Sequence, residues 1–212
     1  MTGQPPSAAP PPSQRYYKQF PDHQTVFPGA FEDLLGYCSA RAATHLVEAL
    51  ADSPDIAIRV LPDTAVVAEW RGTFLNIGSS ASNIKTDAMK RLPENTFLAD
   101  DVGVHLTLHD GKHIAPEDGL DRGYILRLPN PFAPGYNLIA CAGLGEWGTS
   151  GAAWFFAQNW RSLRRRFGTN PFLIVVAVHR GGDQSAREIL AIGKQRWLWR
   201  AARRLLSPLR RR

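Results

Sequence analysis

The sequence predicts a three-layer α/β fold, with helices on both faces of a mostly parallel, doubly wound sheet and an antiparallel hairpin at one edge. Short apolar runs alternate with segments of helical composition along the chain. Two of these runs, Phe74–Gly78 and Asn137–Ala142, lead through a turn of small residues into a helical segment. Further on, Gly181-Gly182-Asp183 can turn one apolar run back onto the next. Repeated strand–turn–helix units are typical of α/β sheets that are covered on both faces.

The 212 residues suit one domain with a tail at each end. Residues Met1–Gln14 are mostly Pro, Ala and Ser and are predicted to be disordered, so the domain is expected to span 15–193. Cys38 and Cys141 lie in apolar context and are too few for a disulfide framework. Because there is no signal peptide and no apolar run long enough to cross a bilayer, the sequence predicts a cytoplasmic protein.

Most of the positive charge lies in the C-terminal tail, Lys194–Arg212. The chain has 25 basic and 19 acidic residues, a net charge of +6; eight of the basic residues and no acidic ones lie in this tail. The rest of the chain therefore has a net charge of −2. The tail mixes its arginines with Trp197 and Trp199 and predicts a basic helix. Such a helix can lie on an anionic membrane surface or bind the phosphates of a nucleic acid. Alternatively, its tryptophans pack on the domain.

The first half of the chain predicts three helices and two strands; the first two helices and both strands come before the first turn of small residues. Ser39 can cap a helix that ends before Pro54, and Asp63 can cap a brief helix through Trp70. The strands and the last helix of this half are expected at Ile56–Val60, Phe74–Gly78 and Ile84–Leu92.

The second half predicts a more strand-rich structure. Val104–Leu108 runs into Asp110-Gly111, a strong hairpin signal. Thr149 and Ser150 are suitable N-caps for a helix that Gly168 ends. The remaining strands are expected at Tyr124–Leu128, Asn137–Ala142, Phe172–His179 and Arg187–Ile192, with Phe172–His179, the most apolar, at the centre of the sheet.

The turn after Asn137–Ala142 is the first candidate binding site. Gly143, Gly145 and Gly148 match the spacing of the dinucleotide fingerprint, and they lie between a strand and a helix as the fingerprint requires. Together with Thr149, they would leave the N–H groups of an open helix N-terminus free for an anionic ligand. The fingerprint also requires an acid about 20 residues further on. That acid is expected at the end of the next strand, which here ends in His179-Arg180, with Asp183 beyond it; an arginine at this place can suit a 2′-phosphate. The alternative is a plain tight turn.

The turn after Phe74–Gly78 is the second candidate site. Its backbone can approach a ligand closely because the residues are small, and its hydroxyl and amide groups can bind phosphate or ribose. The alternative is that these polar groups cap the next helix. Ligands of doubly wound sheets of the Rossmann and flavodoxin type bind beyond the carboxyl ends of the strands. The two turns would therefore form one crevice if their strands are neighbours. The candidate residues of this turn are Gly78, Ser79, Ser80, Ser82 and Asn83.

Glu146 is the only acid inside either turn and is the candidate for catalysis. Its carboxylate can act as a general acid or base, or hold ribose hydroxyls; the alternative is an exposed loop acid. Two further acid pairs, Asp100-Asp101 and Asp118 with Asp121, could hold a cation, but the expectation is that they are solvated loop acids, the commoner case.

No metal site is predicted. His105, His109 and His113 are spaced by four, but they straddle the turn at Asp110-Gly111 and no cysteine joins them. The chain also lacks a G-x-S-x-G elbow, and no lysine follows Gly148 as a P-loop requires.

Three segments, Gly78–Asn83, Asp121–Phe132 and Ala142–Ala153, resemble those of uncharacterised bacterial α/β domains. Those domains look like the doubly wound nucleotide-handling group that includes TIR-like and nucleoside deoxyribosyltransferase-like domains. The resemblance covers about Ile56–Ile192. It implies a nucleotide-type ligand, with an NAD-type nucleotide as a candidate, and cleavage of an N-glycosidic bond by a carboxylate near the ribose, a role that would fall on Glu146.

The sequence thus leaves two functions open. One is a nucleotide- or phosphate-sugar-binding domain that can cleave its ligand. The other is a non-catalytic interaction module that docks on a membrane surface or nucleic acid through Lys194–Arg212.

Overall fold

The computed structural model describes residues 37–51, 53, 56–61 and 71–194, which all belong to the second of two units, Gly36–Arg212. The predictions for Met1–Gln14, for the helix at Asp63–Trp70 and for the tail after Lys194 therefore lie outside the described residues. In the part of the chain that the structure describes, no helix combines the length and apolar character needed to span a bilayer.

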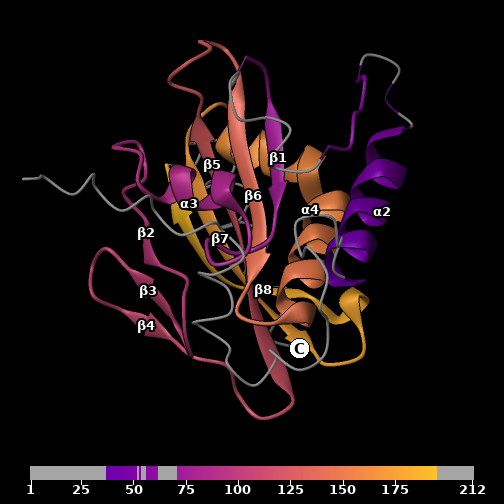
Figure 1. Ribbon diagram of the computed structural model, residues 1–212, viewed down its shortest axis with the longest axis vertical. Helices are drawn as coiled ribbons and strands as arrows, with labels where there is room; N and C mark the ends of the chain where they lie inside the picture. Colours follow the sequence, from indigo (N-terminus) through magenta and orange to yellow (C-terminus); the bar gives the residue numbers. More distant parts are fainter. Residues whose placement is uncertain (1–36, 52, 54–55, 62–70, 195–212) are drawn as a thin grey trace, which may run out of the picture. The chain divides into compact units, whose positions relative to one another are not determined.

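A five-stranded sheet with the strand order β1-β6-β5-β7-β8 forms the middle layer (Figure 1). Of its pairs, only β1 with β6 is parallel; β5 is antiparallel to β6 and to β7, and β7 is antiparallel to β8. The strands are β1 (Phe74–Ile77), β5 (Leu120–Pro129), β6 (Asn137–Gly143), β7 (Phe172–His179) and β8 (Arg187–Gly193).

The predicted mostly parallel, doubly wound sheet is therefore wrong: the sheet is mixed. The reason lies in the connections. Short segments, Asn130–Tyr136 and Arg180–Ala186, join β5 to β6 and β7 to β8, and short connections favour antiparallel neighbours. A long crossover through helix α4 (Glu146–Phe167) lets β6 and β7 run in the same direction, with β5 between them.

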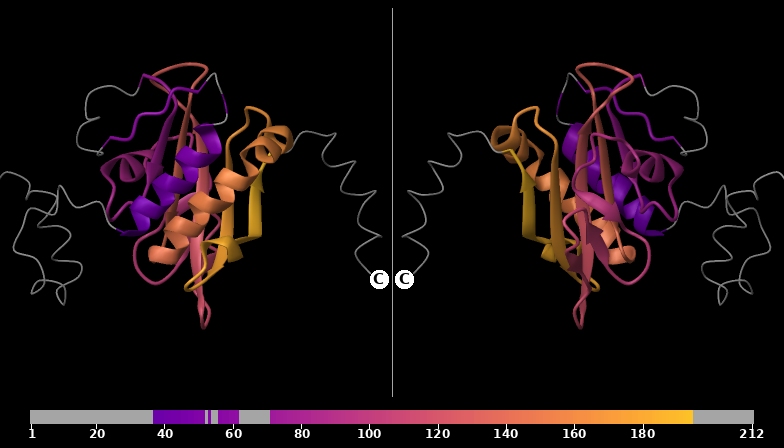
Figure 2. Two further views of the ribbon diagram at one scale, coloured as in Figure 1. Left: turned by 90° about the vertical axis from the view of Figure 1, so that its right-hand side faces the viewer. Right: turned by 90° about the vertical axis from the view of Figure 1, so that its left-hand side faces the viewer.

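Helices α2 (Tyr37–Ala51) and α4 cover one face of the sheet (Figure 2). The opposite face carries the short helix α3 (Ile84–Lys90) and a small antiparallel sheet of the strands β2 (Leu98–Asp100), β3 (Leu106–Leu108) and β4 (His113–Ile114). Alternate residues of each strand serve the two cores, as the strand period requires. On β5, Ile125 packs toward α4, whereas Tyr124 and Leu126 pack toward α3 and the small sheet.

Several local predictions are confirmed. The hairpin at Asp110-Gly111 joins β3 and β4, the hairpin after β7 leads into the edge strand β8, and Gly168 ends α4 with a φ of +62°. Strand β7 is flanked on both sides, but the central strand is β5.

Three local predictions are wrong. Ser39 lies inside α2, which begins at Tyr37, and does not cap it. Helix α4 begins at Glu146 with Gly145 as its N-cap, so Thr149 and Ser150 lie inside the first turns and not at the cap. Ile56–Val60 is not a strand: it is exposed along its length, and none of the described strands pairs with it, although a strand needs a ladder partner.

Backbone contact between α4 and the sheet depends on three glycines. A Cβ on Gly123 of β5 would lie 2.1 Å from the carbonyl oxygen of Gly148, and a Cβ on Gly143 of β6 would lie 2.4 Å from the carbonyl carbon of Gly148. A Cβ on Gly148 itself would lie 2.2 Å from the carbonyl oxygen of Arg122. Any side chain at these positions would push the first turn of α4 away from β5 and β6.

We expect Gly123→Ala to destabilise the fold by about 3 kcal/mol, the upper end of the usual cost of overpacking, because backbone atoms and not flexible side chains oppose the new methyl group. Urea unfolding followed by circular dichroism would measure the loss. Gly182→Ala is the matched control, since its nearest neighbour would lie at 3.7 Å. Equal stability of the two variants would contradict the close packing described here.

Candidate functional site

The two predicted turns lie side by side at one end of the sheet. They follow β1 and β6, which are parallel neighbours with Ile77 opposite Cys141. The N–H of Gly78 donates to the carbonyl of Cys141 over 3.1 Å, so the first turn starts directly beside β6. The strands before the two turns are therefore neighbours, as a shared location of the turns requires.

In the first turn, Asn83 acts as the cap of α3. Its side-chain oxygen accepts hydrogen bonds from the N–H groups of Lys85 and Thr86, both over 2.9 Å. Gly78 has a φ of +109°, a conformation that favours glycine. The carbonyl of Ser79 accepts from the N–H groups of Ser82 and Asn83. These contacts agree with the alternative reading of this turn, in which its polar groups cap the next helix.

A buried carboxylate occupies the middle of the first turn. One oxygen of Asp101 accepts the N–H of Ser80 over 2.8 Å and the hydroxyl of Tyr124 over 2.6 Å. Its other oxygen accepts the Ser80 hydroxyl and forms an ion pair with Lys90 over 3.2 Å. The Asp101 side chain is fully buried. The expectation of a solvated loop acid is wrong here, because Asp101 takes the place in which a bound anion was expected.

Lys90 completes this network and stays charged. Its ammonium group lies 2.8 Å from both Asp100 and the Ser80 hydroxyl. Burial alone would lower the pKa of Lys90, but the hydrogen bond to Asp100 and the charge of Asp101 outweigh burial and raise that pKa above 10.5. A charged lysine cannot accept the proton of Ser80, so the pair does not form a nucleophilic serine–lysine dyad. Burial and the charge of Asp101 likewise keep Tyr124 protonated by raising its pKa.

A second carboxylate occupies the N-terminus of α4. One oxygen of Asp121 accepts the N–H of Gly148 over 2.8 Å, and the other accepts the N–H of Arg122 over 2.7 Å. Asp121 is buried on β5, contrary to the expectation of a solvated loop acid. A Cβ on Gly145 would lie 2.5 Å from an Asp121 oxygen. The helix N-terminus that the sequence left open is thus capped by the chain's own carboxylate, and Gly145 leaves room for it.

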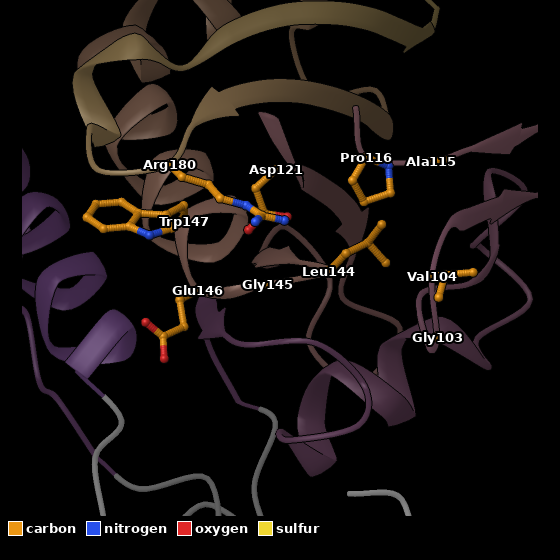
Figure 3. Close-up of a pocket in the computed structure, with 10 residues that line it drawn as sticks. All are labelled: Gly103, Val104, Ala115, Pro116, Asp121, Leu144, Gly145, Glu146, Trp147 and Arg180. Carbon is orange, nitrogen blue, oxygen red and sulfur yellow. The ribbon is translucent and has the colours of Figure 1, made fainter. Parts of the chain in front are cut away.

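A hollow of about 650 Å³ opens beside the second turn (Figure 3). It is lined by Gly103–Val104, Ala115–Pro116, Leu144–Trp147, Asp121 and Arg180. We call this space the hollow. Of the predicted ligand-binding residues it includes Gly145, together with the catalytic candidate Glu146, and no residue of the first turn. The hollow is therefore not the single crevice that was expected between the two turns.

The hollow offers groups of different chemistry. Trp147 presents an indole ring, Glu146 a carboxylate and Arg180 a guanidinium group. In Figure 3 the side chain of Glu146 points away from Asp121 and Arg180. Among the described residues, neither Glu146 nor Arg180 takes part in an ion pair. Both side chains are exposed.

Trp147 packs against a second network of hydrogen bonds and ion pairs, which is centred on Asp183. The guanidinium carbon of Arg41, on α2, lies 4.0 Å from the centre of the Trp147 ring. Asp183, in the 3-10 helix η4 (Asp183–Ser185), accepts hydrogen bonds from Arg41 over 3.2 Å and from the Ser150 hydroxyl over 2.5 Å. His45 lies 3.0 Å from the same carboxylate. Because its oxygens are engaged within the protein, Asp183 does not offer a free acceptor for a ribose.

The remaining sequence candidates lie elsewhere. The rings of His105 and His113 contact each other at 4.5 Å, and no three His, Cys, Asp or Glu side chains within the described ranges gather as metal ligands do. Cys38 and Cys141 are free thiols, and burial raises the pKa of Cys141.

The sequence analysis names Arg180 and Asp121 but does not predict that both line the hollow. The signal that could have found Asp121 is its position two residues before Gly123, on the strand that contacts the glycines of α4. The role of Arg41 had no local signal, because it depends on the packing of α2 against α4.

Comparison of the chain with models of protein families, with curated proteins and with solved structures found no match.

The network around Lys90 predicts a pH dependence of stability. Burial alone would raise the pKa of Asp100, but its hydrogen bond to Lys90 and the charge of Lys90 hold that pKa below 3.8. The pair therefore stabilises the fold above this pH, and the contribution is lost as the pH falls through the lower pKa of the folded state.

Asp100→Asn should remove this part of the acid dependence. We expect the unfolding free energy of the wild type to fall more steeply below pH 4 than that of the variant, measured by urea unfolding between about pH 2.5 and 6. Asp118→Asn, at an exposed acid, is the control and should follow the wild type. Parallel curves for Asp100→Asn and the wild type would contradict the role given to Lys90.

Proposed function

We propose that this chain binds a nucleotide or related phosphate-sugar molecule in the hollow beside the second turn. The observation that supports it is the combination of an aromatic ring, an acid and a guanidinium group around one space of about 650 Å³. That volume lies within the range of small-molecule sites. An NAD-type nucleotide, which contains a base, ribose and phosphates, remains a candidate ligand.

Each group suits a different part of such a ligand. A planar base can stack on Trp147, an interaction that contributes roughly 1–3 kcal/mol per base in nucleic-acid-binding proteins. The Glu146 carboxylate can accept hydrogen bonds from ribose hydroxyls. Arg180 can bind a phosphate through paired N–H groups.

The phosphate is assigned to Arg180 and not to the helix N-terminus. Asp121 already accepts the N–H of Gly148, and Asp101 accepts the N–H and hydroxyl of Ser80. A phosphate at either place would have to displace a buried carboxylate that is hydrogen-bonded on both oxygens. Arg180 is exposed and needs no such displacement.

The experiment is a titration with NAD, NADP, ADP-ribose, ATP and GTP, followed by thermal shift and by calorimetry. A ligand that binds only the folded state raises its melting temperature. Arg180→Gln should weaken binding of a phosphate-bearing ligand about tenfold or more, the value of one charge-assisted hydrogen bond, and leave the binding of adenosine unchanged.

Arg165→Gln is the matched control, because Arg165 is exposed at the opposite end of α4. Gly145→Val would be a poor probe, since its side chain would collide with Asp121. The proposal is wrong if none of these nucleotides binds, or if Arg180→Gln and Arg165→Gln bind them equally.

Cleavage of the ligand at its N-glycosidic bond is the accompanying proposal, with Glu146 acting at the ribose. Glu146→Gln keeps the shape of the side chain and removes its charge. We expect this variant to bind NAD with an affinity within a few fold of the wild type and to release no free nicotinamide, measured by chromatography. Undiminished release by Glu146→Gln would exclude Glu146, and no release by the wild type would leave binding as the function.

A further inference from the structure

Arg122 is a buried cation whose hydrogen-bonding capacity is largely unused. It lies on β5 with 2% of its surface exposed. Its Nη2 forms an ion pair with Glu117 over 2.6 Å, but its Nε and Nη1 have no hydrogen-bond partner within the described part of the chain. Buried charged groups are normally paired and hydrogen-bonded because desolvation is costly. Two unused donors on one buried arginine therefore need an explanation.

The position of Arg122 relates it to the hollow. The N–H of Leu144 donates to the carbonyl of Arg122 over 2.9 Å, next to the paired residues Gly123 and Gly143. Residues opposite each other in neighbouring strands project from the same face of a sheet. Leu144 lines the hollow, and so does Pro116, the neighbour of Glu117. Arg122 itself is not among the residues that line the hollow, but it contacts Leu144 through its backbone and Glu117 through its guanidinium group, and so lies next to the lining.

Arg122 and its partner Glu117 differ in burial. The Glu117 side chain is 71% exposed, whereas the Arg122 side chain is 3% exposed. A long, exposed side chain loses little when it rotates into water, but the buried guanidinium group would then lose the counter-charge that it has among the described residues. Another anion of suitable size could take the place of Glu117 and reach the unused donors.

We propose that Arg122 is a second anion-binding residue of the hollow and that Glu117 is an internal anion which an anionic group of the ligand displaces. The proposal rests on the proposed function, and it assigns to the ligand a second negative charge, such as a second phosphate, beside the one held by Arg180. Glu117 then also sets the affinity, because every anion must compete with it.

The test uses inorganic pyrophosphate as the probe, on the full chain, with potassium chloride at equal ionic strength as the reference. Without pyrophosphate, Glu117→Gln should melt below the wild type, because Arg122 has lost its counter-charge. Pyrophosphate should restore the melting temperature. Its affinity for Glu117→Gln should be about tenfold or more above that for the wild type. Asp118→Asn is the control for net charge and should show neither effect.

The double variant Glu117→Gln with Arg122→Met tests the role of the arginine itself. It replaces the buried arginine by an apolar side chain and its exposed partner by a neutral one, so that no buried charge is left unpaired. The gain in pyrophosphate affinity should be lost in this variant. The proposal is overturned if pyrophosphate affects Glu117→Gln and Asp118→Asn equally, or if the double variant keeps the gain. Nucleotide binding that depends on Arg180 but is unchanged by Glu117→Gln would overturn this inference alone.

Discussion

The backbone contact between the first turn of α4 and the strands β5 and β6 is the constraint on which the site depends. Gly123, Gly143 and Gly148 permit it, because a Cβ at any of them would lie within 2.4 Å of a backbone atom. The contact brings the N-terminus of α4 onto Asp121, which caps it, and leaves Glu146 and Trp147 at the edge of the hollow. Packing is therefore enough to explain the glycine spacing, whether or not a ligand binds.

Internal carboxylates occupy the two turns in which the sequence predicts an anionic ligand. Free N–H groups at a helix N-terminus attract anions, and the chain satisfies them itself with Asp101 in the first turn and Asp121 in the second. Both acids are buried and hydrogen-bonded on both oxygens. In the function proposed above, phosphate recognition falls to two arginine side chains that differ in burial: Arg180 is exposed, and Arg122 is buried and paired with Glu117.

Much of the local structure was predictable from the sequence. The strand at Phe172–His179 follows from an unbroken run of apolar residues, the hairpin at Asp110-Gly111 from its turn chemistry, and the end of α4 from Gly168. The start of α4 was misplaced by four residues because Thr149 and Ser150 resemble caps. The N-cap is Gly145, and the side chain that accepts an N–H of the first turn is Asp121, which is distant in sequence and leaves no local signal. The sequence pattern could not predict that β5 is antiparallel to its neighbours, because a buried strand shows the same apolar run in a parallel and in an antiparallel sheet.

The sequence by itself determined the strand–turn–helix units, the glycine spacing and the identity of the polar residues near the site, since these follow from short-range periodicity and turn chemistry. Only the tertiary structure decided what those residues do. Strand order places Asp121 under α4, and it places Leu144 opposite Arg122 beside the hollow. The packing of α2 brings Arg41 onto Trp147. The physical reason is that burial and hydrogen bonding depend on which distant segments meet, and charged side chains such as Asp101, Asp121 and Arg122 acquire their roles only through those contacts.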